Sequence, residues 1–507
     1  MSKIRVRFAP SPTGPLHIGG LRTALYNYLY ARSKGGDMIL RIEDTDRSRY
    51  VSDAERYIHE ALRWSGIKID EGPENGGILG PYRQSERVNL YKNYAEKLVK
   101  SGWAYYAFDS PDELEEMRKK KEAEGVHSPK YDWKIREEMN NSLNMSEAEL
   151  AAAIEGGTPF VIRFKMPSEG EVIFRDEIRE EVSFDCSELD DKVLLKADGW
   201  PTYHLANVVD DYLMQISHVI RGEEWLSSTG LHVLLYRAFG WESNVPSFAH
   251  LPLILKPGGK GKLSKRDGAK FGIPVFPLDW KDEESGDLYL GFKEMGFDPA
   301  AVINFIAFLG WNPGGEEEIY SLEEMEKLFT LDRVGKSGAR FDFDKAKWFN
   351  QQYLLDSSPE EIAEQAMPYL RIVGLNPTED YLVKVCVLMR ERMQLVSELP
   401  QSAKFFFTDN FPMDDKQMKK RWKEDSPAIV EGMKKLLNTI HPFEKSEIEN
   451  AIKAYIDEKN LKFGQVLPLL RLAVSGTMQG PDIFATMALI GKEKCNDRLK
   501  AISLRQT

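Results

Sequence analysis

The sequence predicts an α/β protein with a doubly wound parallel sheet, an α+β insertion that splits it, and a helical C-terminal part. Strand and helix signals alternate over residues 1 to about 100 and return over about 200–240. The composition shifts from about residue 104, and nearly every pattern from about residue 340 onward is helical. A chain of 507 residues is too long for one hydrophobic core, so several domains are expected.

The first hundred residues read as two strand–helix units. Ile4 to Phe8 alternates β-branched and aromatic residues with arginines and predicts the first strand. A helix is expected from about Gly20, because Leu21, Leu25, Tyr28 and Leu29 then fall on one face. Met38 to Glu43 predicts the second strand, and a second helix is expected from about Asp53 through Trp64. This order indicates the first half of a parallel sheet.

The predicted insertion carries its own helices and strands. Residues 112–124 form a charged helical pattern, and a second helix over 146–155 begins at Ser146, where Glu149 completes a capping box. Alternating strand patterns follow at 160–165 and 172–175.

The segment from Pro10 to Gly20 reads Pro-Ser-Pro-Thr-Gly-Pro-Leu-His-Ile-Gly-Gly and lies between the first strand and the first helix. The N–H groups and the positive dipole end of a helix N-terminus attract an anion, and small residues let it approach. The segment therefore predicts a phosphate-binding turn. Taken alone, His17 followed by glycine is equally compatible with an ordinary turn.

A second segment, Lys256 to Phe271, holds six basic residues and four glycines, and we expect a mobile cationic loop. Alone it resembles any solvated surface loop. Together with the histidine turn, its lysines Lys262 and Lys265 suit a reaction that releases pyrophosphate from ATP.

Three charged residues stand at the ends of apolar runs: Arg7, Glu43 and Arg221. Ligands bind outside the carboxyl ends of strands in open parallel sheets, so these side chains can converge in one crevice. An internal ion pair at the strand ends is the simpler alternative. As a binding site, one acid for an amine and two guanidinium groups for carboxylates fit a small dicarboxylic amino acid.

Composition excludes several classes of protein. The net charge of −12 argues against a generic nucleic-acid coat but allows a local basic track for RNA. No apolar run is long enough to span a membrane, and no targeting sequence is evident at the N-terminus. Only three cysteines are present, which indicates a reducing compartment, and we expect a cytoplasmic protein.

These motifs resemble those of the class I aminoacyl-tRNA synthetases, and among them the bacterial-type glutamyl-tRNA synthetases. The resemblance covers nearly the whole chain. It rests on Arg7 to Gly20, Arg41 to Arg47, Pro201 to Asn207, Val219 to Trp225 and Lys262 to Arg266, and it extends through Phe305 to Gly315 and Gly464 to Gly476.

The resemblance implies a Rossmann-like catalytic domain, an acceptor-end-binding insertion, a connecting domain and a helical anticodon-binding part. The expected bounds are 1–103 and 196–256 for the two catalytic halves, 104–195 for the insertion, 257–340 for the connecting domain with the lysine loop, and 341–507 for the anticodon-binding domain.

It also implies the substrates and their sites. L-glutamate and ATP would form glutamyl-adenylate, and the glutamyl group would pass to the terminal adenosine of tRNA(Glu), with activation dependent on bound tRNA and the enzyme a monomer. The implied residues are Arg7, Ser11, Glu43, Tyr203, Asn207 and Arg221 for glutamate; His17, Gly19, Gly20, Lys262, Ser264 and Lys265 for ATP; His17, Lys262 and Lys265 for catalysis; and Arg392 or Arg390 for an anticodon base.

Metals are expected only as Mg²⁺ with ATP. Some relatives carry a zinc knuckle in the insertion, but the stretch from Tyr105 to Trp133 has no cysteine and only His127, so no structural zinc is expected. Packing of Tyr105, Tyr106, Tyr131 and Trp133 is a candidate substitute.

Several alternatives stay open. In one alternative the enzyme also charges tRNA(Gln), and in another it is a glutaminyl-type synthetase. Against the second, the neutral amide of glutamine would leave a buried Arg221 unpaired. A small-molecule adenylyltransferase and a truncated tRNA-modifying paralogue share the histidine turn but do not need the helical C-terminal half. A silent RNA-binding homologue would not need His17, Lys262 and Lys265.

Overall fold

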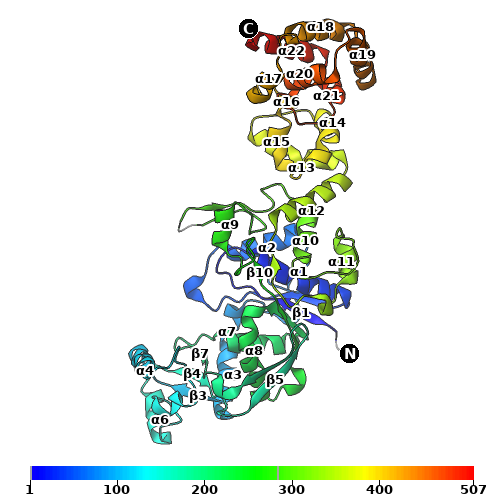
Figure 1. Ribbon diagram of the computed structural model, residues 1–507. Helices are drawn as coiled ribbons and strands as arrows, with labels where there is room; N and C mark the ends of the chain where they lie inside the picture. Colours follow the sequence, from blue (N-terminus) through cyan, green and yellow to red (C-terminus); the bar gives the residue numbers. More distant parts are fainter. Residues whose placement is uncertain (1–2, 283–284, 507) are drawn as a thin grey trace. The chain divides into compact units, whose positions relative to one another are not determined.

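The predicted alternation of strands and helices is present in the computed structural model, which describes residues 3–282 and 285–506 (Figure 1). Strands β1 (Arg5–Phe8) and β2 (Asp37–Leu40) pair in parallel, and helix α1 (Ile18–Ser33) connects them. Helix α1 begins two residues before the expected Gly20, because the His17 side chain caps it by accepting the Gly19 N–H. Helices α2 (Ala54–Trp64) and α3 (Val88–Lys100) follow.

The second half of the sheet contains β8 (His218–Gly222) and β9 (Ser247–Leu251), which also pair in parallel. Helix α7 (Tyr203–Leu213) precedes β8, and α8 (Leu226–Ala238) connects it to β9. The Ser217 N–H donates to the Arg5 carbonyl at 2.9 Å, which places β8 beside β1. The carboxyl ends of β1, β2 and β8 therefore lie along one edge, as an open α/β sheet requires for a binding crevice.

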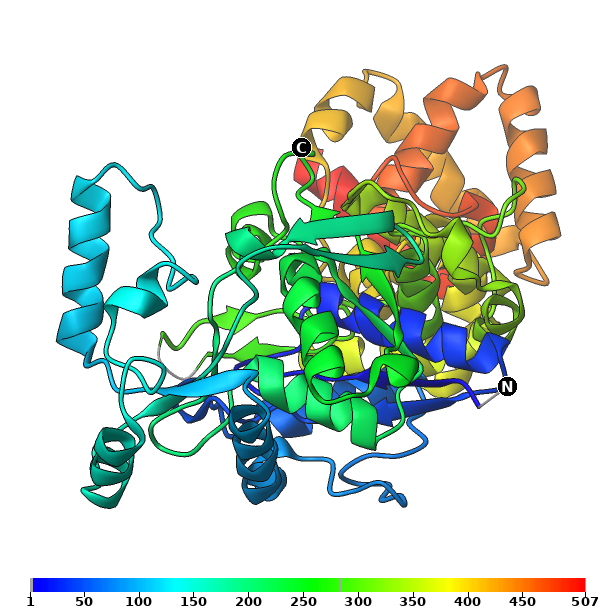
Figure 2. The same cartoon turned by 90° about the horizontal axis from the view of Figure 1, so that it is seen from below.

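The inserted region consists of a small antiparallel sheet with helices. Strand β4 (Val161–Phe164) lies between β3 (Ala104–Ala107) and β7 (Val193–Leu195). Helices α4 (Pro111–Ala123), α5 (Ile135–Glu138) and α6 (Glu147–Glu155) accompany this sheet, and Ser146 and Glu149 form the predicted capping box. Figures 1 and 2 both place α4 and α6 away from α1 and β1.

One hairpin inside the predicted insertion lies elsewhere. Strands β5 (Glu171–Asp176) and β6 (Glu180–Asp185) pair with each other, and β5 joins β9 in parallel through Asp176 and Phe248. Phe174 and Val172 are buried in the same core as Phe248. Residues 104–195 are therefore not one separate α+β body, because burial of this apolar face places the hairpin at the edge of the β8–β9 sheet.

The lysine segment is more ordered than a loop. Strand β10 (Ile254–Leu255) pairs with β13 (Ala339–Arg340), and the bridge from Leu255 to Lys262 closes a turn that leads into helix α9 (Lys265–Phe271). The Gly268 position of α9 packs against Val275, which leaves no room for a larger side chain. The mobile loop expected from the glycines thus contains a helix in its second half.

The remaining elements are short strands and mostly amphipathic helices. They are β11 (Trp280–Lys281), β12 (Leu288–Tyr289), α10 (Pro299–Ala307), α11 (Leu322–Leu328), α12 (Phe343–Asp356), α13 (Pro359–Ile372), α14 (Glu379–Met389), α15 (Leu399–Ser402), α16 (Lys404–Phe407), α17 (Asp415–Arg421), α18 (Ser426–Thr439), α19 (Lys445–Glu458), α20 (Phe463–Ser475), α21 (Ile483–Ile490) and α22 (Lys492–Gln506). Single 3₁₀ turns lie at Arg47–Arg49, Gln84–Arg87, Cys186–Glu188, Glu223–Trp225, Glu242–Asn244, Leu331–Arg333, Arg390–Arg392 and Val396–Glu398.

The chain divides into two compact units. The N-terminal unit comprises residues 1–291 and 303–343, and the C-terminal unit comprises residues 292–302 and 344–507. The boundary near residue 343 lies close to the expected start of the helical part at 341. Residues 292–302, by contrast, fall in the predicted connecting domain but group with the C-terminal unit, where Tyr369 donates to the Lys293 carbonyl and Ser397 to the Met295 carbonyl.

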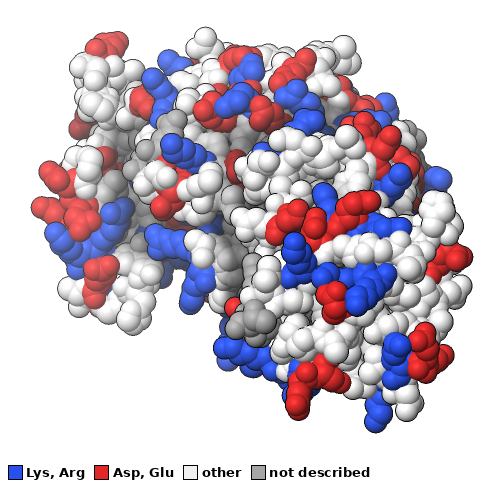
Figure 3. Space-filling view, turned by 90° about the horizontal axis from the view of Figure 1, so that it is seen from above, with Lys and Arg blue, Asp and Glu red and all other residues white. Residues whose placement is uncertain are grey.

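The C-terminal unit has a helical hydrophobic core that includes Leu382, Val385, Val430, Ile452 and Leu470. On the face seen in Figure 3, basic and acidic side chains are interspersed. Within the described ranges, no helix has both the length and the apolar character that crossing a bilayer requires.

Candidate active site

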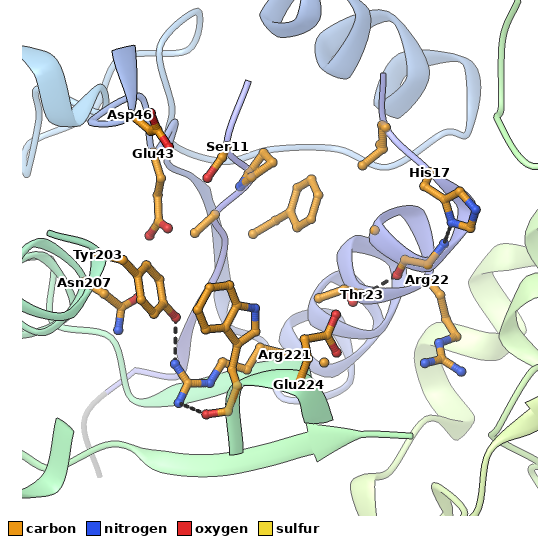
Figure 4. A pocket seen from close by; sticks show the side chains of 18 of the residues that line it. Ser11, His17, Arg22, Thr23, Glu43, Asp46, Tyr203, Asn207, Arg221 and Glu224 are labelled. Carbon is orange, nitrogen blue, oxygen red and sulfur yellow. Dashed lines mark hydrogen bonds between the residues drawn. The ribbon is translucent and has the colours of Figure 1, made fainter. Parts of the chain in front are cut away.

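All the residues predicted to bind glutamate and ATP line one pocket of about 970 Å³ in the N-terminal unit. They are Arg7, Ser11, His17, Gly19, Gly20, Glu43, Tyr203, Asn207, Arg221, Lys262, Ser264 and Lys265. Figure 4 shows Glu43, Tyr203 and Asn207 on one side of this pocket and His17 and Thr23 on the other. The pocket therefore has two chemically different ends. We call the end with Glu43, Tyr203 and Asn207 the carboxylate end and the end with His17 the phosphate end, after the ligand groups that the sequence predicts there.

His17 forms the phosphate end together with the start of α1. Its Nδ1 accepts the Gly19 N–H at 3.1 Å, so the ring proton resides on Nε2, which is buried and has no partner among the described residues. Burial lowers the pKa of His17 to about 4, and the charges of Lys262 and Lys265 add to this effect. The imidazole is thus a neutral hydrogen-bond donor at neutral pH.

The backbone of this turn is only partly available to an anion. The Ile18 N–H already donates to the Val275 carbonyl at 3.0 Å, and the Gly19 N–H is taken by His17. Fewer backbone N–H groups at the start of α1 are therefore free to bind an anion than the sequence indicated. The His17 Nε2–H, which has no partner among the described residues, is the donor that remains available.

Two lysines contribute cationic groups from the segment after β10. A Cβ atom on Gly14 would lie 2.7 Å from the Lys265 Nζ, so this ammonium group lies directly against the histidine turn. The Lys262 Nζ lies 2.8 Å from a carboxylate oxygen of Glu224, which also lines the pocket. Ser264 is engaged locally, because its N–H and its hydroxyl both donate to Asp267, at 2.9 and 2.5 Å.

At the carboxylate end, Arg7 is already paired. Its Nε donates to Asp211 Oδ1 at 3.0 Å, and its Nη2 donates to Asn207 Oδ1 at 3.1 Å. Both Arg7 and Asp211 are buried. The simpler alternative of an internal ion pair at the strand end is therefore realised for Arg7.

Arg41 was missed at the sequence level although it lies in the same segment as Glu43. Its guanidinium is fully buried and donates to Asp211 at 2.7 Å, to Glu43 at 3.0 Å and to Asn207 at 3.1 Å. Burial raises the pKa of Glu43, and Arg41 and Arg7 oppose that shift. For Asp211 the same two arginines outweigh burial and lower the pKa. Asn207 and Asp211 are spaced i and i+4 on α7, which is a signal that was available in the sequence.

Arg221 has a different environment. Its Nη1 donates to the Tyr203 hydroxyl and its Nη2 to the Thr229 hydroxyl, both at 2.8 Å, and its Nε donates to His250 Nε2 at 3.1 Å. The ring of Tyr203 in turn packs on Trp225 at a centroid distance of 4.2 Å. Among the described residues, no carboxylate lies within ion-pair distance of this buried guanidinium.

Among the three buried arginines at this end, only Arg221 has no carboxylate in direct contact. Arg7 is matched by Asp211 and Arg41 by Glu43, whereas Arg221 has only neutral partners. A buried charge without a counterion is costly, so the pocket favours a ligand that brings a net negative charge.

The two arginines predicted to read the anticodon lie in the C-terminal unit, in the 3₁₀ turn Arg390–Arg392 that follows α14. Arg392 is exposed and Arg390 is partly buried. Neither guanidinium has a carboxylate within 4.0 Å in the described part of the chain, so an ion pair with Glu391 is not formed. The charge of Arg392 also lowers the pKa of Arg471, after the larger effect of burial.

The described residues contain no group of three or more His, Cys, Asp or Glu side chains placed to hold a metal ion. The three cysteines, Cys186, Cys386 and Cys495, are free and buried.

Comparison with known proteins agrees with this geometry. Residues 3–348 match the catalytic domain of the tRNA synthetases class I (E and Q), and residues 361–503 match an anticodon binding domain. The chain belongs to the class I tRNA synthetases, and it is an aminoacyl-tRNA ligase.

Within that class it belongs to the glutamate–tRNA ligase family. It is 52% identical to the glutamate–tRNA ligases of Christiangramia forsetii and Parabacteroides distasonis, over 98% of this chain and 98% of each relative. A crystal structure of the glutamate tRNA ligase from Elizabethkingia meningosepticum in complex with its amino acid is 47% identical, with a TM-score of 0.96 over the full length of both chains. The predicted fold class, enzyme class and family are thereby confirmed.

Proposed function

We propose that this enzyme activates L-glutamate with ATP in the pocket described above and transfers it to the 3′-terminal adenosine of tRNA(Glu). One observation carries the proposal: a buried, uncompensated guanidinium (Arg221) and a neutral imidazole donor (His17) line the same pocket. L-Glutamate, with two carboxylates and one ammonium, brings the net negative charge that the carboxylate end lacks.

At the carboxylate end, Arg221 binds one carboxylate of glutamate, and the Tyr203 hydroxyl holds the guanidinium in place. Glu43 accepts the ammonium group together with Ser11, because one Glu43 oxygen is bound by Arg41 and the other stays available. Arg7 and Asn207 shape this end through Asp211 and Arg41. Glutamine is neutral overall, so it would leave the Arg221 charge unmatched, and discrimination by such a mismatch is strong.

At the phosphate end, an oxygen of the glutamate α-carboxylate attacks the α-phosphorus of ATP. The new P–O bond forms as the bond to the β-phosphate oxygen breaks, and pyrophosphate leaves. The His17 Nε2–H donates to the oxygens that gain charge, and Lys262 and Lys265 hold the departing phosphates. Gly19, Gly20 and Ser264 line the rest of the phosphate end of the pocket. Catalysis is then positioning with electrostatic stabilisation, without a covalent enzyme intermediate.

In the second step the 2′-hydroxyl of the terminal adenosine attacks the glutamyl carbonyl, and AMP leaves. The tRNA would enter along the insertion with β3, β4 and β7, and Arg392 or Arg390 would read an anticodon base. A tRNA requirement for the first step belongs to the same proposal.

Mg²⁺ would enter with ATP. The described lining residues provide no cluster of carboxylates for a resident ion, which suits an ion held by phosphate oxygens and water. Because the family acts in translation and all three cysteines are free, we place the enzyme in the cytoplasm. The monomeric state is proposed on the resemblance alone.

The test is one charging assay with purified tRNA(Glu) and tRNA(Gln), ATP and labelled glutamate or glutamine. Glutamate on tRNA(Glu) is the expected product. Glutamate on both tRNAs would identify a non-discriminating enzyme, and glutamine on tRNA(Gln) would overturn the assignment. Arg221→Gln in the same assay is expected to raise the glutamate KM at least tenfold and to leave the ATP KM within about twofold.

A further inference from the structure

Arg221 is held by a histidine, His250, which is itself held by a carboxylate, Asp176. His250 Nε2 accepts the Arg221 Nε–H at 3.1 Å, and His250 Nδ1 lies 2.6 Å from Asp176 Oδ2. The His250 and Asp176 side chains are both inaccessible to solvent. His250 does not line the pocket, so it acts on a ligand only through Arg221.

Asp176 is fixed as an ionised acceptor. Its Oδ1 accepts the backbone N–H groups of Ile178 at 3.0 Å and Arg179 at 2.8 Å, in the turn between β5 and β6. Its other oxygen then requires a proton from His250, so Nδ1 carries the proton and Nε2 presents its lone pair to Arg221. The tautomer of the imidazole is thus set by the carboxylate.

The position of this pair follows from the sheet. Asp176 on β5 is in register with Phe248 on β9, two residues before His250, and Arg221 on β8 is in register with His250. Three adjacent parallel strands therefore carry the carboxylate, the imidazole and the guanidinium, with Asp176 offset by two residues from the His250–Arg221 pair. The β5–β6 hairpin supplies the first member, although the sequence pattern assigned it to the insertion.

The chemistry of this order matters for the substrate. A carboxylate in direct contact with Arg221 would neutralise the charge that the amino acid must meet. An interposed neutral imidazole supplies the hydrogen bond and keeps the carboxylate one residue farther away. The other neutral partners are the hydroxyls of Tyr203 and Thr229, the Trp225 carbonyl at 3.4 Å, and His232, whose Nδ1 lies 3.3 Å from Arg221 Nη1.

We propose that Asp176 and His250 are positioning residues for amino-acid selection: they orient the Arg221 guanidinium and leave its charge free for a carboxylate of the substrate. This inference rests on the proposed role of Arg221 in glutamate binding.

The experiment compares two substitutions of His250 that each keep one of the two hydrogen bonds of the imidazole. In His250→Asn the side-chain amide can still donate to Asp176 but has no acceptor that reaches Arg221, whereas the longer His250→Gln can reach Arg221 but loses Asp176. The readouts are the KM for glutamate, the KM for ATP and kcat in pyrophosphate exchange with saturating tRNA(Glu). We expect His250→Asn to raise the glutamate KM about tenfold or more, with the ATP KM within twofold, and His250→Gln to recover part of this loss.

Two further variants separate positioning from folding. Asp176→Asn is isosteric and is expected to raise the glutamate KM severalfold, since the amide no longer fixes the imidazole tautomer. His218→Asn is the matched control. His218 lies on β8, the strand that carries Arg221, and it hydrogen-bonds Tyr30 and Ser217 outside the pocket. It should leave the glutamate KM unchanged, and thermal unfolding of every variant is recorded beside the kinetics.

The outcomes divide cleanly. A raised glutamate KM in Arg221→Gln, His250→Asn and Asp176→Asn, with an unchanged ATP KM, supports the inference. If Arg221→Gln raises it and Asp176→Asn and His250→Asn do not, the positioning role is wrong and the proposed function stands. If Arg221→Gln leaves it unchanged, the proposed glutamate site is itself overturned. If the variants raise the KM for ATP as much as the KM for glutamate, or if His218→Asn raises the glutamate KM equally, the role is structural only and the inference is refuted.

Discussion

The Lys265 ammonium group lies against Gly14, so closely that a Cβ on Gly14 would come within 2.7 Å of Nζ. Two segments separated by some 250 positions in the sequence thus meet at one point of the pocket. Lys265 Nζ also lies 5.9 Å from the centroid of Phe276, whose ring packs edge-on against His17. The cation and the imidazole therefore both lie near the Phe276 ring.

The first prediction follows from this contact. Lys265→Ala should lower kcat for pyrophosphate exchange by an amount equivalent to about 2–4 kcal/mol, the cost of removing one donor that stabilises developing charge. The glutamate KM should change little, because the lysine acts at the other end of the pocket. Lys260→Ala, an exposed lysine of the same segment that does not line the pocket, is the control.

Gly14→Ala tests the same contact from the other side. Gly14 has a φ of +144°, so an alanine strains the backbone and also displaces the ammonium group. It should reduce exchange in the same direction as Lys265→Ala and add little when both are combined. Full turnover in either single variant would remove Lys265 from the mechanism.

A second prediction concerns pH. Burial lowers the pKa of His17 and His204 to about 4, and it lowers the pKa of four further histidines below the ordinary value near 6.5. These four are His59, His218, His232 and His250. At these six histidines the unfolded chain binds more protons than the folded chain between about pH 6.5 and 4. Their contribution to the free energy of unfolding should therefore fall as the pH falls through that range.

For His17 and His204 this loss should amount to about 1 kcal/mol each at pH 5.5. Urea unfolding at pH 7.5 and pH 5.5 measures it, and His204→Asn should flatten the pH dependence. Equal or greater stability at pH 5.5 would contradict the assignment of neutral, buried imidazoles.

The insertion provides a third prediction, because it contains a buried polar cluster around Asp191. This carboxylate accepts Arg136 Nη1 at 3.1 Å, the Tyr105 hydroxyl at 2.7 Å and the Met166 N–H at 2.9 Å. Asp191→Ala leaves the buried Arg136 without a carboxylate, with only the Met166 carbonyl as a partner at 2.9 Å, and should destabilise this region by about 3–5 kcal/mol. Limited proteolysis around α4 and α6 would detect the loosening, and Lys130→Ala, on the exposed surface, should have no effect.

A fourth prediction follows for metal content. We expect less than about one-tenth of a zinc ion per chain in protein prepared without chelator, since Tyr105 to Trp133 contains no cysteine. Addition of a chelator should leave the melting temperature unchanged. One zinc per chain in elemental analysis would refute this expectation.

The fifth prediction concerns Arg392. If this exposed guanidinium reads an anticodon base, Arg392→Gln should raise charging of tRNA(Gln) relative to tRNA(Glu) by an amount equivalent to about 1–3 kcal/mol of lost discrimination. The KM values for ATP and glutamate should stay unchanged, because the residues predicted to bind these substrates all lie in the N-terminal unit. Arg390→Gln, two positions away on the same turn, is the matched comparison, and if neither ratio moves this turn does not read the anticodon.

The sequence alone was sufficient for the fold class, the family and the set of residues around the pocket. The reason is local: the strand–turn–helix order, the histidine turn and the lysine segment each need particular residue types at short spacing, and those residues are visible without a structure. His17, Lys262 and Arg221 were therefore found from their neighbours in the chain.

The tertiary structure decided which charges cancel. Arg7 and Arg221 follow apolar runs in the same way, yet Arg7 is neutralised by Asp211 from α7, while Arg221 meets only neutral partners. The sequence also placed Asp176 in the insertion, whereas strand pairing brings it to His250. Long-range pairing and burial fix these relationships, because Coulomb energies depend on distances between segments far apart in the chain and no local pattern encodes them.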